Sequence, residues 1–183
     1  MAFKGKQINN PKTGQHILFL QTAKDTNGQL LEMETTYNAK SKEPVAHYHP
    51  YQAEDFTVLS GELTVRIKGQ LKTLHAGDTL HIPANQVHAM WNASTEKTIV
   101  NWKVQPAMDT EYLFEMMYGL AHDGKTNKNG MPNFFQLILT ARKFSDVFRL
   151  AKPSFTIQEI YFFFLSPWAH LFGYRSTDKK YLD

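Results

Sequence analysis

Between residues 17 and 104, apolar and polar side chains alternate with a period of two, interrupted by short clusters of turn-forming residues. This alternation is typical of half-buried β-strands, and Asp-Thr-Asn-Gly at residues 25–28 is one of the strongest turn signals. We expect residues 1–14, which are polar, to form turns. The pattern predicts nine short strands, at residues 17–22, 30–37, 45–49, 54–59, 63–68, 71–74, 79–82, 87–91 and 98–104. Many short strands at this spacing predict a sandwich or barrel of antiparallel strands.

The period changes to that of a helix after Pro106. Asp109 is a candidate N-cap for a first helix, whose apolar positions are Leu113, Met116, Met117 and Leu120. After a loop at residues 122–132, apolar residues indicate a second helix from Phe134 to Phe148. A third helix follows Pro153, and its predicted apolar face consists of Ile157, Ile160, Tyr161, Phe164, Leu165 and Trp168.

These two patterns divide the chain into a mainly β part, residues 1–105, and a helical extension, residues 106–183. A length of 183 residues suits one ordinary domain with an appendage, and 42% apolar residues suit an ordered globular protein. The sequence pI is about 9.0. Net charges of +3, −1 and +1 in residues 1–42, 43–105 and 106–183 show no strongly basic segment, so we expect no nucleic-acid partner.

The chain has no cysteine, which excludes disulfides, thiolate metal ligands and a thiol nucleophile. Its first ten residues lack the apolar core of a secretion signal, which favours a cytoplasmic protein. The longest apolar run, residues 155–172, is interrupted by polar residues and Pro167. A spanning helix needs about 20 mainly apolar residues, so a membrane span is not expected.

One histidine pair and a nearby carboxylate point to metal chemistry. His47 and His49 lie two apart on a predicted strand and therefore project from the same face. Glu54, on the next strand, shares its predicted inner face with Phe56 and Val58. His88 comes from a different strand.

Three neutral imidazoles and one carboxylate suit one divalent ion of Fe, Mn, Ni, Zn or Cu, and the ligand types alone do not choose among these metals. The competing interpretation is that each histidine is a surface or core residue, which is how we interpret His16, His75, His122 and His170. His81 alternates with apolar neighbours and is expected to face away from the core.

The spacing of these residues resembles a known family. His47, His49, Glu54 and Gly61 resemble the first motif of the cupin superfamily in order and spacing. The second motif is represented by Gly77, Pro83, His88 and Asn92.

The resemblance covers residues 45–105 and implies a cupin jelly-roll β-barrel that binds a metal through His47, His49, Glu54 and His88. Glu54 is favoured over its neighbour Asp55 by strand parity and by the motif spacing. Two positions depart from the pattern, because Ser41 and Asn85 replace expected glycines. Asparagine tolerates the left-handed conformation well, so the turn at residue 85 should be preserved. Gly61 and Gly77 are interpreted as turn residues and Asn92 as structural.

A substrate pocket is predicted from the apolar residues that share faces with the ligands, although the same residues can equally be barrel core. They are Phe56, Val58, Leu63, Val65, Met90 and Trp102.

The helical extension resembles the tails of other bacterial single-barrel cupins. We interpret its aromatic face, which includes Tyr161, Phe164 and Trp168, as packed against the barrel or against a second subunit. Binding to a membrane surface is the less favoured alternative, supported by flanking cations at Arg149, Lys152 and Arg175. A homodimer is expected because exposed sheet edges need covering.

The resemblance implies a metal-dependent oxygenase or related oxidoreductase that acts on a small organic molecule, with Glu54 as a possible base if it leaves the metal during turnover. One alternative is a non-catalytic binding or sensing protein, since a fold does not fix a function. Another is a sugar isomerase or epimerase, which would need further acid–base and cationic groups at the site. Arg66 and Lys68, both in the motif region, are expected to face outward.

Overall fold

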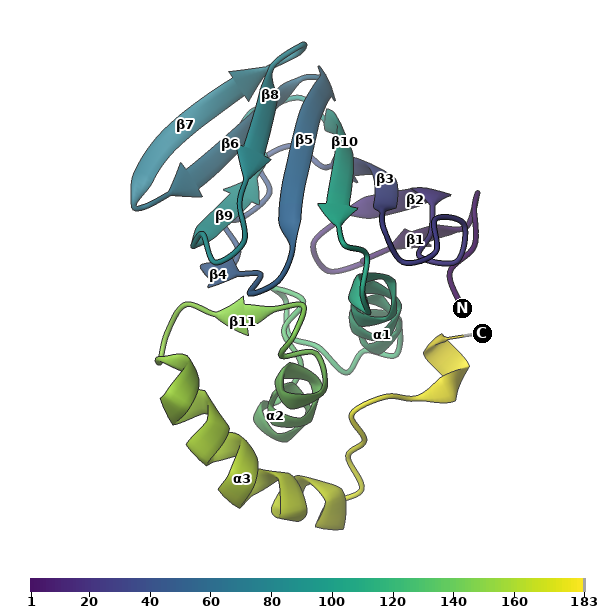
Figure 1. Cartoon of the computed structure of the whole chain (residues 1–183), viewed down its shortest axis with the longest axis vertical. Coiled ribbons are helices and arrows are strands. Elements are labelled where there is room, and N and C mark those ends of the chain that lie inside the picture. The colour runs from purple at the N-terminus through teal and green to yellow at the C-terminus, as the bar shows by residue number, and fades with distance from the viewer. Residues whose placement is uncertain (183) are drawn as a thin grey trace.

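A computed structural model describes residues 1–182, and it arranges the strands in two antiparallel sheets above a layer of helices (Figure 1). The first sheet has the order β1 (Gln7–Asn9), β2 (His16–Gln21), β3 (Leu31–Tyr37), β10 (Thr98–Gln105), β5 (Ala53–Ser60) and β8 (Thr79–Ile82). The second has the order β11 (Arg149–Leu150), β4 (His47–Tyr48), β9 (His88–Trp91), β6 (Glu62–Ile67) and β7 (Gln70–His75). This arrangement confirms the predicted mainly β, jelly-roll fold class.

All nine predicted strands are present, and two short ones were not predicted. In β1, Gln7 pairs with Leu18, and in β11, Leu150 pairs with His47. Strands of three and two residues are too short to show a period, so neither could be recognised from alternation.

The core lies between the two sheets and is built from the inward residues of both. Along β3, Leu31, Met33 and Tyr37 are buried, while Glu32 and Glu34 on the other face are partly exposed. The hairpin predicted from residues 17–37 is therefore confirmed, with one wetter face.

Three helices and a short 3-10 turn follow the sheets: α1 (Thr110–His122), α2 (Phe134–Lys143), α3 (Phe155–Leu171) and η1 (Lys179–Tyr181). The Asp109 side chain does not cap α1 and instead forms an ion pair with Lys143 of α2, at 3.0 Å. The prediction that the second helix reaches Phe148 was wrong, because α2 ends at Lys143 and the chain then turns into β11.

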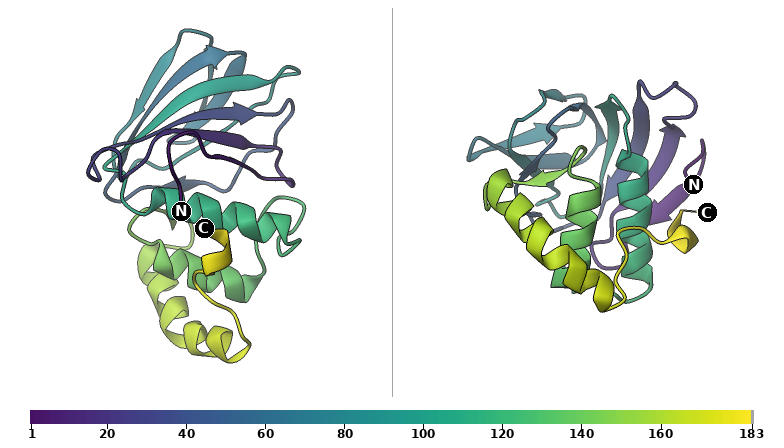
Figure 2. Two further views of the ribbon diagram at one scale, coloured as in Figure 1. Left: turned by 90° about the vertical axis from the view of Figure 1, so that its right-hand side faces the viewer. Right: turned by 60° about the horizontal axis from the view of Figure 1, so that its bottom comes forward.

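The helices form successive layers beneath the sheets, with α2 between α3 and the rest of the molecule (Figure 2). In α1, Phe114, Met117 and Tyr118 pack against the core cluster. The residues of α3 that are buried are Gln158, Phe162, Ser166 and Ala169.

The predicted aromatic face of α3 does not pack against the barrel. Tyr161, Phe164 and Trp168 are 46%, 63% and 56% exposed. The buried side of α3 includes the polar residues Gln158 and Ser166, so the apolar stripe did not predict which side is buried. Burial of this face in a homodimer stays a prediction.

The two ends of the described chain meet at α1 (Figures 1 and 2). Gly119 lies directly beneath the Tyr181 ring, and a Cβ at that position would overlap the ring. The Tyr181 hydroxyl donates a hydrogen bond to Asp123 at 2.5 Å. The missing side chain of Gly119 thus lets η1 pack onto α1.

The substitution Gly119→Ala should therefore release η1. In an open helix this change would raise the free energy of unfolding by about 1 kcal/mol, but here the new Cβ displaces Tyr181. We expect trypsin to cleave faster after Lys179 and Lys180, as measured by mass spectrometry. We expect no increase in the free energy of unfolding. In a Tyr181→Ala background the same change should restore the ordinary gain. A stabilised Gly119→Ala protein with unchanged cleavage would contradict this packing.

Candidate metal centre

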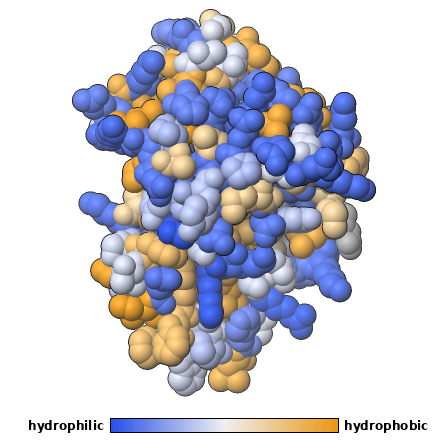
Figure 3. All heavy atoms as spheres, in the orientation of Figure 1, coloured by the Kyte–Doolittle hydropathy of each residue, from blue (hydrophilic) through white to orange (hydrophobic). Residues whose placement is uncertain are grey.

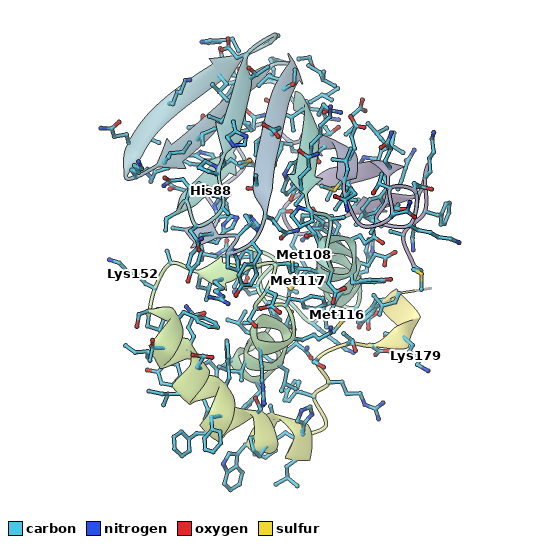
Figure 4. All side chains as sticks on the ribbon, in the orientation of Figure 1. His88, Met108, Met116, Met117, Lys152 and Lys179 are labelled. Carbon is cyan, nitrogen blue, oxygen red and sulfur yellow. The ribbon has the colours of Figure 1, made fainter. Side chains whose placement is uncertain are left out.

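Three histidines, His47, His49 and His88, converge into one group. Figure 4 labels His88, which lies at the end of the sheets that faces the helices. His47 of β4 pairs directly with His88 of β9, and directly opposed residues of antiparallel strands bring their side chains together. His49 follows two residues after His47 and projects from the same face. One ligand nitrogen from each ring lies within 4.8 Å of the others, so these histidines could hold a metal ion.

Each of the three imidazoles is held by a backbone carbonyl. The Nδ1 atom of His47 lies 3.1 Å from the Val45 oxygen, and that of His88 lies 2.9 Å from the Gln86 oxygen. His49 Nδ1 donates to the Val147 oxygen at 2.5 Å. A carbonyl accepts only a proton, so these contacts place the proton on Nδ1 and leave the Nε2 lone pair free for a metal.

Glu54 approaches this group from the opposite sheet and is fully buried. Its Oε1 atom accepts a hydrogen bond from Trp102 Nε1 at 3.0 Å and lies 3.3 Å from His49 Nε2. Its Oε2 atom lies 3.0 Å from His88 Nε2. The inward direction predicted for Glu54 is confirmed, and Asp55 faces outward, where it contacts His81 at 2.7 Å.

Burial and mutual interaction shift the pKa values in this cluster. Burial, together with repulsion by His88 and His49, lowers the pKa of His47 to about 3, so this ring is neutral at physiological pH. For Glu54, burial alone would raise the pKa, but attraction to the three histidines outweighs it and the pKa is lowered. For His88, burial would lower the pKa, but contact with Glu54 outweighs it and the pKa is raised. The cluster therefore combines a neutral imidazole with an ionised carboxylate.

The atoms of this cluster fit a metal ion. Within residues 1–182, neither His49 Nε2 nor Glu54 Oε2 has a hydrogen-bond partner, although both are buried. An unpaired buried polar atom is costly. The ligand nitrogens of the three histidines lie within 4.8 Å of one another, with the Glu54 carboxylate in contact with His49 and His88, and a cation between the rings would stabilise this arrangement.

The comparison with protein families agrees with this geometry. A family model described as a cupin domain matches residues 33–102, which carry all four predicted ligands. This part of the chain is a cupin domain.

A curated relative of this cupin domain is quercetin 2,3-dioxygenase of Bacillus subtilis (strain 168), with 41% identity over 66 residues. The match covers 36% of this chain but only 19% of that enzyme. The similarity is therefore limited to one segment, and it does not show that this chain has the activity of the whole enzyme.

Two solved structures are similar to this chain at low sequence identity. A predicted oxalate decarboxylase from Thermotoga maritima has a TM-score of 0.50 and 16% identity, and the match covers 58% of this chain and 99% of that one. A sugar phosphate isomerase from Silicibacter pomeroyi DSS-3 has a TM-score of 0.48 and 18% identity, over 55% of this chain and 70% of that one.

The turn residues of the cupin motifs behave as predicted. Gly61 and Gly77 have φ values of 77° and 92°, and Asn85, which replaces an expected glycine, has a φ of 65°. Asn85 also donates its backbone N–H to the His49 carbonyl at 2.8 Å, so this turn supports a strand that carries a ligand. Asn92 is structural, because its side chain accepts from the Ser94 N–H at 2.9 Å.

The helical extension supplies two contacts to the cupin site that were not predicted. The Val147 carbonyl holds His49, and the Phe148 ring stacks on His47 with centroids 4.7 Å apart and planes at 25°. Both residues were predicted to belong to the second helix. The Ser145-Asp146 dipeptide, which favours turns, is the one sequence signal that the helix ends earlier.

A cavity of about 250 Å³ adjoins the three histidines. Two of the six predicted pocket residues, Met90 and Trp102, line it. The other four lie in the core cluster: Phe56, Val58, Leu63 and Val65. Alternation on a strand predicts that a side chain points inward, but not whether the cavity reaches that position along the strand. The remaining walls come largely from the extension, including Leu113, Phe114, Tyr118, Phe144 and Phe148.

The cavity lining is uncharged. Among the described residues that line it, none is an aspartate, glutamate, lysine or arginine. Arg66, as predicted, lies away from the cavity and is paired with Glu43 at 2.6 Å. The polar residues of the lining besides the histidines are uncharged, and they include Tyr37 and Thr110.

The stacking of Phe148 on His47 predicts an effect on metal binding. Phe148→Ala should weaken metal affinity by about 10- to 100-fold, the usual cost of removing a group that orients a ligand. Competition with a chelator measures this affinity, and thermal unfolding checks that the variant folds. Phe134→Ala, which removes a phenyl ring that is 57% exposed on α2, is the matched control and should leave affinity unchanged. Equal affinities in both variants would show that the stack does not orient His47.

Proposed function

We propose that this cupin is a metal-dependent oxygenase or related oxidoreductase acting on a small, uncharged, mainly apolar molecule. The observation that carries the proposal is the position of the cluster. Three converging imidazoles line one wall of a cavity whose lining has no charged side chain, and the buried carboxylate of Glu54 contacts two of them, His49 and His88.

In the proposed enzyme His47, His49 and His88 hold the metal, with Glu54 as a fourth ligand. A divalent metal with an open coordination position supplies a Lewis acid that binds and polarises a substrate oxygen. The ligand set does not select among Fe, Mn, Ni, Zn and Cu.

Other groups of the chain orient the ligands and exclude water. Trp102 donates a hydrogen bond to Glu54 Oε1 and thereby orients the carboxylate. Glu54 could serve as a base only if it leaves the metal during turnover, and its lowered pKa keeps it ionised for that role. Met90, Phe114 and Phe148 provide apolar walls that keep water from the site.

The lining also bears on the alternatives. A sugar phosphate carries charge that a site usually binds with arginine or lysine, and neither type lines the cavity. The isomerase alternative is therefore disfavoured. A non-catalytic binding protein would use the same apolar cavity, and only a test of turnover separates it from an enzyme.

The metal prediction is tested by histidine substitution. Purified protein should contain a single divalent ion per chain by elemental analysis, and His49→Ala should lose it because one of three imidazoles is gone. His81→Ala is the matched control, since His81 is an exposed histidine paired with Asp55, and it should retain the metal. Full metal retention in His49→Ala would exclude this site.

The enzyme prediction is tested with an oxygen electrode. The metal-loaded protein should consume oxygen with an uncharged phenol or β-diketone and not with a sugar phosphate, and His49→Ala should abolish the uptake. Oxygen uptake that persists in His49→Ala would point to chemistry elsewhere. No uptake with any compound, together with a ligand that co-purifies unchanged, would favour the binding protein.

A further inference from the structure

The outer face of α3 is apolar and exposed. We define this face as Ile157, Ile160, Tyr161, Phe163, Phe164, Trp168, Leu171 and the adjoining Phe172. Their exposed fractions run from 42% to 74%, and they are eight of the sixteen large hydrophobic side chains that are exposed in the described chain. Half of such side chains thus lie within 16 consecutive residues. Contiguous exposed apolar surface of this kind marks an interaction site.

Helix geometry shows that this face is wide. At about 100° per residue, its members span about half of the helix circumference. The opposite side, with Phe162, Ser166 and Ala169, is buried, and α2 is the helix that α3 contacts most. A helix on the surface of a globular protein normally turns a polar face outward, and α3 does the reverse.

The position of α3 leaves this face accessible. It is the element farthest from the sheets in Figure 1, and Figure 2 shows it on the outside of α2. Figure 3 shows hydrophobic residues gathered over the corresponding lower part of the molecule, below a mainly hydrophilic upper part. Within residues 1–182, no helix combines the length and apolar character needed to cross a bilayer.

Positive charge borders the outer face. Lys152 precedes α3, Arg175 follows it, and Arg142 lies in the groove beside its first turns. None of the three forms a salt bridge with another described residue. The acidic residue of α3 is Glu159, which lies outside the apolar arc and lines the same groove as Arg142. Unpaired cations at both ends of an apolar helix are complementary to anionic lipid headgroups.

We propose that α3 docks this protein on an anionic lipid surface, with its outer face in the interface and its axis parallel to the membrane. Ile160, Phe164 and Leu171 reach the acyl boundary. Tyr161 and Trp168 lie toward one edge of the arc, where amphipathic rings favour the headgroup region.

Two features favour lipid over a second copy of the chain. A seam between two helices uses a narrow apolar stripe, whereas this face covers about half of the helix. In a symmetric dimer through α3, the bordering cations of both copies would also gather at one interface. A bilayer surface can cover the whole apolar half of the helix, and its anionic headgroups neutralise the bordering cations.

Trp168 provides a direct readout of docking. Trp91 and Trp102 are 9% and 8% exposed, whereas Trp168 is 56% exposed, so a change in emission on adding vesicles reports α3. With vesicles of phosphatidylcholine and phosphatidylglycerol we expect a blue shift, and co-sedimentation of the full chain. Trp168→Phe should remove the blue shift and retain sedimentation. Absence of both signals in the parent protein would overturn the proposal.

Paired variants separate lipid docking from dimerisation. Phe164→Ser with Leu171→Ser should weaken vesicle binding at least ~10-fold, because two apolar side chains no longer enter the interface. Leu71→Ser, at a leucine of β7 that is 59% exposed, is the control and should bind as the parent does. Lys152→Glu with Arg175→Glu should remove the preference for phosphatidylglycerol. The proposal would be overturned if the Phe164/Leu171 variant bound vesicles as well as the parent does. It would also be overturned if the parent were a dimer that did not bind vesicles and the variant were a monomer.

Discussion

The hydrogen bond from His49 Nδ1 to the Val147 carbonyl, at 2.5 Å, joins the cupin domain to its helical extension at the candidate metal centre. The same few residues of the extension place Phe148 on His47 and pair β11 with β4. A buried imidazole needs a partner for its second nitrogen, and that partner decides which nitrogen is free to bind a metal. The extension thus decides which nitrogen of His49 carries the proton, and it packs a phenyl ring against His47.

The cluster concentrates the polar chemistry of the cavity at one wall. Glu54 comes from the first sheet and the histidines from the second, so the packing of the sheets sets their separation. The remaining lining is uncharged. In such surroundings electrostatic interactions are stronger than in water, which explains why His47, His88 and Glu54 shift one another's pKa values. A metal and an apolar ligand would share this environment.

The extension has two surfaces with different roles. Its inner side, through Phe144 and Phe148, closes the cavity, and its outermost helix turns an apolar face away from the molecule. Small residues on α3, such as Ser166 and Ala169, lie on the side that is buried. They allow the helix to pack closely beside the buried Phe162, while the large aromatic residues of the outer face remain exposed. This division of large and small side chains sets which side of α3 is available to a partner.

The sequence by itself determined nine of the eleven described strands, the shared face of His47 and His49, the inward direction of Glu54 and the left-handed turn at Asn85. Each depends on local periodicity or backbone preference, which short segments encode. Tertiary structure alone decided the contacts of Val147 and Phe148, because β11 has two residues and no periodic signal. It also decided which residues form the cavity walls. Alternation along a strand predicts the direction of a side chain but not the position of a helix that packs beside it. The outer face of α3 was undetermined for a similar reason: an apolar stripe shows which side of a helix is apolar, but not whether that side turns toward the protein or away from it.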